Sequence, residues 1–125
     1  MEKISTIQKR ENLNEVYAVD EKGNGGANHR YAIAKVTEEP SNTPMPIIIE
    51  IQLQNGARKD EKSIHGVLDS DLLEIVRHRL QCFQEGDFAT RENAIALTHI
   101  EEALLSMNKR FEDRIERNVL GTMNK

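Results

Sequence analysis

A long stretch near the C-terminus, residues 90–117, contains neither glycine nor proline and so can fold as one uninterrupted helix. Thr90 can cap the amides of its first turn, and Gly121 suits a C-terminal stop. We therefore predict a single helix about 40 Å long, over residues 90–118. Its apolar side chains recur at spacings of three and four residues, the period of one helix face. They are Leu97, Ile100, Leu104, Met107, Phe111 and Ile115.

Two polar residues bracket this apolar stripe. Asn93 lies one step before it and Arg114 near its other end, in the same heptad position as Met107. A polar residue at such a position can set the register of packed helices, or its amide can read the edge of a base. Both interpretations of Asn93 stay open. For Arg114, a buried seam would require the guanidinium to find an anion.

Other apolar residues of this region, Ile95, Leu105 and Leu120, lie off the stripe, so one sheet cannot cover them all. The chain also lacks Trp, and only 4% of its residues are aromatic, which leaves few large side chains to fill a core. Small chains of this kind gain burial by association. We therefore expect a homo-oligomer.

Composition excludes several classes of protein. The net charge of −4 argues against non-specific nucleic-acid binding, which needs a basic face. Cys82 is the single cysteine, so no intrachain disulfide forms, and a reducing cytosol is expected. The N-terminus lacks an apolar signal core, and no run approaches the roughly 20 apolar residues that cross a bilayer. We expect a soluble intracellular protein with no membrane partner.

The region before residue 68 is predicted to form strands separated by turns. The clearest strand is 47–54, where isoleucines and Leu53 alternate along one face. The proline-rich segment 38–46 is predicted to be a loop, and Asn55-Gly56 a hairpin turn. The other predicted strands are 4–9, 14–20, 29–36 and a short one at 62–67.

A first helix is predicted from a cap at Asp69 or Ser70 to about residue 84. Strands followed by helices indicate an α+β fold, with a small antiparallel sheet before two helices. With 125 residues the chain is expected to be one domain, 1–125, with the sheet at about 3–67 and the helices at about 69–84 and 90–118.

A glycine-rich turn, Gly23-Asn24-Gly25-Gly26, is a candidate for phosphate binding through its backbone amides. It matches neither a Walker A loop nor a dinucleotide fingerprint, since Asn28 stands where a third glycine would be. On pattern alone a plain hairpin turn is favoured.

Arg110, Arg114 and Arg117 share one helical face, and guanidinium groups can bind phosphates bidentately. The competing interpretation is a solvated face with local ion pairs such as Asp113 to Arg117, which is favoured for Arg117. Phe83, at the end of the first helix's stripe, is either a core aromatic or, less commonly, a platform on which a base stacks.

No catalytic or metal-binding set stands out. The four histidines are scattered without metal-ligand spacing, and Cys82 is expected to be a buried or half-buried structural thiol. A non-enzymatic binding module without cofactor or metal is therefore favoured.

Several segments together resemble the phage Thoeris anti-defence family of signal-sequestering "sponge" proteins. They are Gly-Gly-Ala-Asn-His-Arg-Tyr at 25–31, Gln-Asn-Gly at 54–56, Phe-Ala-Thr-Arg-Glu-Asn at 88–93, Ala-Leu-Thr-His-Ile-Glu-Glu-Ala-Leu at 96–104, and the tail from 110 to 122. The helix segment is also similar to a second phage sponge family, directed against cyclic-oligonucleotide (CBASS) signalling.

The resemblance implies a phage protein in the cytoplasm of the infected bacterium that captures a cyclic ADP-ribose isomer and holds it uncleaved. It implies dimers or hexamers with pockets where protomers meet. By position, Phe83 would stack on the adenine and Asn93 would read its edge. Arg110 and Arg114 would bind the pyrophosphate, helped by amides near Gly25, Gly26 and Asn28.

A second site, for cyclic oligonucleotides, is attributed to hexameric members of that family. Arg58, Thr90 and Arg91 are the candidates for it here. The alternatives to the main expectation are an enzyme that cleaves the nucleotide signal, a sponge mainly for cyclic oligonucleotides, and a purely structural coiled-coil adaptor.

Overall fold

The computed structural model describes residues 1–37 and 46–123. The chain divides into two compact units. Residues 1–56 and 62–66 form the sheet unit, and residues 57–61 and 67–125 form the hairpin unit. The prediction that residues 1–125 act as one domain stays a prediction.

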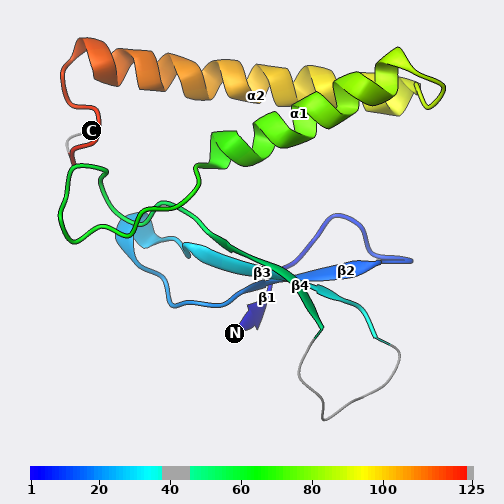
Figure 1. Ribbon diagram of the computed structural model, residues 1–125, viewed down its shortest axis with the longest axis horizontal. Coiled ribbons are helices and arrows are strands. Elements are labelled where there is room, and N and C mark those ends of the chain that lie inside the picture. The colour runs from blue at the N-terminus through cyan, green and yellow to red at the C-terminus, as the bar shows by residue number, and fades with distance from the viewer. Residues whose placement is uncertain (38–45, 124–125) are drawn as a thin grey trace. The chain divides into compact units, whose positions relative to one another are not determined.

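The sheet unit holds a four-stranded antiparallel sheet in the order β1-β2-β3-β4 (Figure 1). A short 3-10 turn, η1 (Asn24–Gly26), lies between β2 and β3. With two helices following the sheet, the predicted α+β class is confirmed. The strands are β1 (Glu2–Lys3), β2 (Asn14–Ala18), β3 (Arg30–Lys35) and β4 (Ile47–Gln52).

The strand predicted at 4–9 is wrong: β1 ends at Lys3, and Ile7 is fully exposed. The segment after β1 instead folds on itself, because the Thr6 hydroxyl donates to the Gln8 carbonyl and the Gln8 amide donates to the Arg10 carbonyl. Such local side-chain bonds compete with strand pairing.

The strand predicted at 62–67 is reduced to one bridge, Asn55 with Ile64. Asn55-Gly56 therefore does not form a two-residue hairpin, although Gly56 has a positive φ of 95°. Instead, the Asn55 side-chain oxygen accepts a 2.8 Å hydrogen bond from the side-chain Nδ2 of Asn24, which joins Asn55 to the glycine turn. The loop predicted at 38–46 lies, up to residue 45, outside the described residues.

The buried apolar side chains of the described residues are all alanines: Ala18, Ala32 and Ala34. They come from the two central strands, where antiparallel pairing places Ala32 opposite Tyr17 and Ala34 opposite Glu15. Three isoleucines of the edge strand β4 stay about half exposed, at 45% for Ile47, 55% for Ile48 and 49% for Ile49. The predicted alternation is interrupted by a bulge, because Ala34 pairs with Ile47 whereas its neighbour Ile33 pairs with Ile49. The burial along the strand does not alternate, and its isoleucines do not fill a core.

The hairpin unit consists of α1 (Asp69–Glu85) and α2 (Arg91–Glu116). The Thr90 hydroxyl accepts from the Asn93 amide at 3.0 Å, so the predicted cap of α2 is confirmed. Neither Asp69 nor Ser70 caps α1; the cap position is Leu68, whose amide donates to the Asp71 carboxylate at 2.8 Å.

Helix α2 stops at Glu116, before the predicted residue 118 and before Gly121. Asn118 adopts a positive φ of 57°, its amide donates to Ile115, and the Val119 amide donates to Arg114. This is a Schellman motif, in which a left-handed residue satisfies the last carbonyls of a helix. Asn tolerates that conformation and so ends the helix three residues before the glycine.

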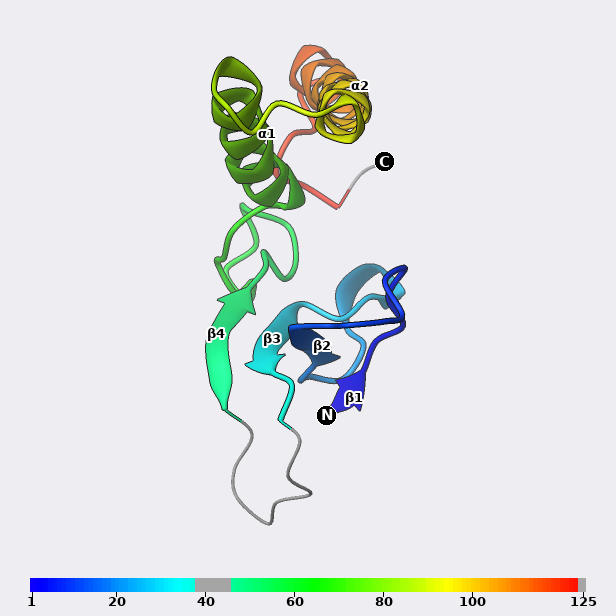
Figure 2. The same ribbon diagram turned by 90° about the vertical axis from the view of Figure 1, so that its right-hand side faces the viewer.

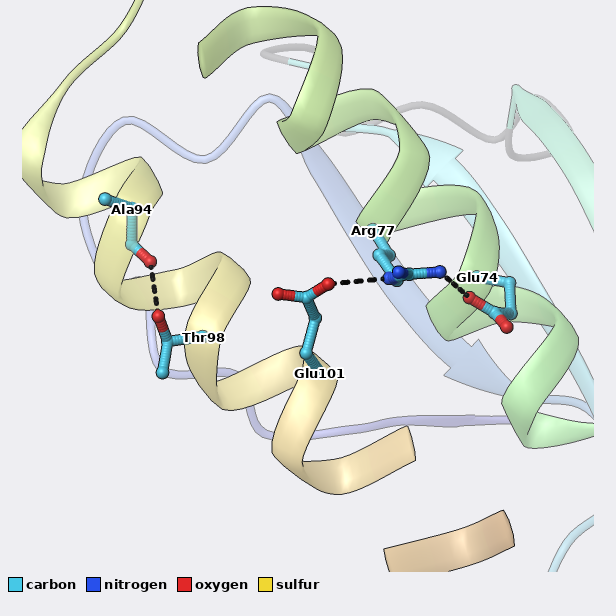
Figure 3. Close-up of polar contacts among 5 residues, drawn as sticks. All are labelled: Glu74, Arg77, Ala94, Thr98 and Glu101. Carbon is cyan, nitrogen blue, oxygen red and sulfur yellow. Dashed lines mark hydrogen bonds and ion pairs between the residues drawn. The ribbon is translucent and has the colours of Figure 1, made fainter. Parts of the chain in front are cut away.

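The two helices lie side by side, joined by residues 86–90, and they converge toward that connection (Figure 1 and Figure 2). Arg77 of α1 links them: its Nε donates to Glu101 of α2 at 2.9 Å, and its Nη1 lies 3.4 Å from Glu74 (Figure 3). Within α2, the Thr98 hydroxyl donates a hydrogen bond to the Ala94 carbonyl. No helix of the described residues is long and apolar enough to cross a membrane.

The helix stop gives a stability prediction. Asn118→Ala should lower the free energy of unfolding by about 1 kcal/mol, because alanine resists the left-handed conformation. Asn118→Gly should be at least as stable as the wild type, because glycine adopts a positive φ readily. Denaturant unfolding followed by far-UV circular dichroism, at one protein concentration, measures both. Equal stability of the alanine variant would contradict the assignment.

Candidate functional site

The end of the hairpin unit where residues 86–90 join the two helices, here called the closed end, carries two of the candidate ligand residues. Phe83 lies in the last turn of α1, is half-buried, and has the Arg79 guanidinium 5.2 Å from the centre of its ring. Asn93 occupies the third position of α2 and is also half-buried. An aromatic face and a carboxamide at neighbouring helix ends are the groups that stack on and read a base.

The opposite end of α2 carries the candidate arginines. Arg110 is exposed. Arg114 is only 7% exposed, and a guanidinium buried to this extent needs polar partners. Its Nη2 donates to the carbonyls of Val119 and Thr122, at 3.0 and 2.9 Å, which ties the end of α2 to the chain that follows it. Arg117 pairs with Asp113 at 3.4 Å, as the competing interpretation of that residue predicts.

These two groups cannot meet within one chain. Along a straight helix, Asn93 lies about 25 Å from Arg110 and about 31 Å from Arg114. A nucleotide is much shorter than either distance. A pocket that uses both groups must therefore take the closed end from one protomer and the arginine end from another.

The glycine turn belongs to the sheet unit, and its conformation does require glycine. Gly25 and Gly26 have φ values of 72° and 77°, and a Cβ at either would meet nothing within 4 Å. The turn is closed by hydrogen bonds from the Gly23 amide to Ala27 and from the Gly26 amide to Gly23, at 2.8 and 3.0 Å. These positions combine open space with left-handed backbone, as an anion-binding turn needs.

Asp20 anchors the far side of this turn, and sequence reasoning missed it. Its carboxylate accepts from the His29 amide at 3.0 Å and from the Arg30 amide at 3.2 Å. The Asn28 side chain donates to the Asp20 carbonyl at 2.7 Å. The His29 ring contacts the Asn24 carbonyl at 2.8 Å, across the same turn. Asp20 follows a strand without any motif, so only the folded contacts identify it.

The charge state of Asp20 reflects these contacts. Partial burial acts to raise the pKa of its carboxyl. The amides of His29 and Arg30, with the Asn28 side chain, outweigh that effect and hold the pKa below its ordinary value.

The residues of the expected second site are also divided. Arg58 lies beside Gly121, where an added Cβ would sit 3.5 Å from the Arg58 Cβ, and the Lys59 amide donates to the Gly121 carbonyl at 2.9 Å. Thr90 and Arg91 lie at the opposite end of α2. One protomer therefore cannot combine the three, and this site too would require neighbouring chains.

A groove of about 730 Å³ opens between α1 and α2 on the side away from their connection. Its α2 wall includes Leu105, which is 70% exposed, and Met107 and Phe111, which are about 40% exposed. Glu101 and Arg77 line its polar side. The signal for it in the sequence was Leu105, which lies off the main apolar stripe. Such a surface suits an apolar helix.

Two smaller expectations concern reactive groups. Within residues 1–37 and 46–123, no group of three or more metal-ligating side chains is found. Cys82 is exposed, so the prediction of a buried or half-buried thiol is wrong. Its sulfur lies 3.9 Å from Nε2 of His78, one turn earlier in α1.

The fold and the candidate site together define a class: a small sheet followed by a helical hairpin whose candidate ligand residues lie at opposite ends. The chain belongs to the Acb2/Tad1 hairpin domain family, whose model matches residues 45–112. The match includes Phe83, Asn93 and Arg110, whereas Arg114 and the glycine turn lie outside it.

A relative named "Thoeris anti-defense 1", from Bacillus phage SBSphiJ7, is 48% identical over 65 residues. That alignment covers 52% of this chain and 46% of the relative, so the chain matches about half of that protein's length.

The anchoring of the glycine turn predicts a pH dependence. Because the folded-state pKa of Asp20 is lowered, its contribution to the turn is present above the ordinary value of 3.8 and is lost as the pH falls through the lower folded-state pKa. The NMR signals of the His29 and Arg30 amides should therefore titrate with a midpoint below 3.8. Asp20→Asn should remove this titration. A midpoint at or above the ordinary value would contradict the anchor.

Proposed function

We propose that this chain is a phage anti-defence protein that binds the cyclic ADP-ribose isomer signal of the Thoeris system and holds it without degrading it. Its place of action is the cytoplasm of the infected bacterium. Membership in the Acb2/Tad1 hairpin family and the name of the phage relative support the anti-defence role. One observation carries the ligand assignment. The hairpin has an aromatic ring and a carboxamide, Phe83 and Asn93, at one end, and two arginines, Arg110 and Arg114, at the other.

The proposed pocket is composite. Phe83 stacks on the adenine and Asn93 reads its edge, while arginines of a neighbouring protomer bind the pyrophosphate. Among those arginines Arg110 is exposed and available, whereas Arg114 already holds two carbonyls. The glycine turn supplies amides near Gly25, Gly26 and Asn28. Binding of this kind removes the signal by mass action and needs no turnover.

Assembly follows from the same surfaces. The groove and the exposed apolar side chains of α2 are covered by a second copy, which gives a homo-oligomer, a dimer or a hexamer. In the hexamer, Arg58, Thr90 and Arg91 of neighbouring chains would form the site for cyclic oligonucleotides. The runner-up function is an enzyme that cleaves the same signal.

Release of the captured signal separates a sponge from an enzyme. The protein is incubated with the cyclic ADP-ribose isomer made by a Thoeris sensor, freed of unbound nucleotide, and heated. We expect the intact nucleotide in the supernatant, able to activate the Thoeris effector, because binding changes no covalent bond. Mass spectrometry identifies the released species. Recovery of only linear or cleaved product would contradict the sponge proposal. Phe83→Ala is the non-binding control.

A mixing experiment tests the composite pocket. Phe83→Ala and Arg110→Ala should each abolish or strongly weaken binding. Co-expressed, they should recover about a quarter of the wild-type sites, because half of two-fold pairs are mixed and one of their two pockets is intact. Calorimetry gives the number of sites and their affinity.

The matched control for that experiment mixes Phe83→Ala with Asn93→Ala. Both substitutions lie at the same end of the hairpin, so every pocket of a mixed pair carries one of them. This mixture should recover no wild-type sites. Equal behaviour of the two mixtures would show that the pocket does not combine opposite ends of neighbouring chains.

A further inference from the structure

The connection between the two helices contains a bidentate contact that none of the assignments above uses. The Gln84 side chain accepts from the Thr90 amide through Oε1 at 3.0 Å and donates through Nε2 to the Thr90 carbonyl at 3.1 Å. A carboxamide thus pairs with both backbone groups of one residue, as a neighbouring strand would. Gln84 is half-buried, although the connection itself is exposed.

Thr90 is itself hydrogen-bonded to the first turn of α2. Its hydroxyl accepts from the Asn93 amide at 3.0 Å, and its carbonyl also accepts the first helical bond, from Ala94, at 3.1 Å. The chain of contacts therefore runs from Gln84, directly after Phe83, through the cap residue to Asn93. Few other contacts hold the connection: the Gly86 amide donates to Phe83 at 3.2 Å, and the Ala89 amide to Gly86 at 3.4 Å.

We infer that Gln84 is a positioning residue for the ligand pocket, which fixes the start of α2, and with it Asn93, relative to Phe83. The inference rests on the proposed function, since it concerns how these two residues meet one purine. A ring and a carboxamide recognise the same base only if their separation is held within a fraction of an ångström. A side chain with both a donor and an acceptor is required, because the Thr90 peptide presents both groups.

The test replaces Gln84 by methionine, which has a similar length but cannot make the two hydrogen bonds. Gln81→Met is the matched control: the same change on the same helix, at a glutamine with no side-chain hydrogen bond among the described residues. Amide hydrogen exchange, measured without nucleotide, reports on the contact between Gln84 and Thr90 alone. In Gln84→Met the Thr90 and Asn93 amides should lose protection while those in the middle of α2 keep it; unchanged protection at Thr90 and Asn93 would overturn the inference.

Affinity for the cyclic ADP-ribose isomer made by a Thoeris sensor then separates positioning from general stabilisation. Gln84→Met should raise the Kd about tenfold, as the loss of two modest hydrogen bonds would. Combined with Asn93→Ala, it should add less than about a twofold loss, because the residue it positions is gone. Combined with Arg110→Ala, it should still add the full tenfold. Gln81→Met should bind like the wild type.

Two affinity results would also overturn the inference. An equal loss in every background would make Gln84 a structural residue only. Unchanged affinity in Gln84→Met, with wild-type binding intact, would remove any role in the pocket. Failure of the wild type itself to bind the nucleotide would instead reject the proposed function, and the role of Gln84 toward that ligand with it.

Discussion

The length of α2 is the constraint on which the rest depends. Twenty-six residues without glycine or proline form one rigid element, and rigidity fixes how far apart its two ends lie. The groups suited to a base stand at one end, and the groups suited to a pyrophosphate stand at the other. A flexible linker between them could fold back to close a pocket within one chain. A continuous helix cannot, so a pocket of the proposed kind requires two chains, and in that proposal ligand binding and association become the same requirement.

The weak internal packing of each unit fits that requirement. Within the described residues the buried apolar side chains are three alanines, while Ile75 of α1 and Leu105 of α2 are 65% and 70% exposed. An ion pair such as Arg77 with Glu101, in which both side chains are 39% exposed, adds little by itself. Its value lies in setting how the helices align, because a charge pair has one favourable register. In the proposed assembly, a second copy buries the remaining apolar surface.

The sequence predicted the helices better than the strands, for a physical reason. The period of three to four residues runs the whole length of α2, and Thr90 marks its start unambiguously. At 4–9, by contrast, the strand pattern is only six residues long, and Thr6 and Gln8 bond locally instead of pairing. The end of α2 was placed too late because Gly121 was the obvious stop, whereas Asn118 satisfies the last carbonyls earlier.

The candidate ligand residues could be named from the sequence, because a family resemblance assigns positions. The residues that hold them could not. Asp20 and Gln84 bind backbone groups six to ten positions away, and a backbone partner leaves no mark on the sequence of the residue it pairs with. Such side-chain to backbone contacts can be identified only from the folded structure of the turn.

Arg114 shows why such contacts matter for interpreting substitutions. Its guanidinium is buried and donates to two carbonyls beyond the end of α2, and the Gly121 carbonyl in the same segment accepts from Lys59. Removing the side chain would break both hydrogen bonds and loosen the tie between α2 and the chain after it, although the Val119 carbonyl would still accept from Thr122. That cost is separate from any contact with a ligand. Weaker nucleotide binding after Arg114→Ala would therefore combine two effects, whereas Arg110 is exposed and reports on the ligand more directly. Arg114, which borders the apolar stripe in the sequence, is therefore the more ambiguous of the two arginines to test by substitution.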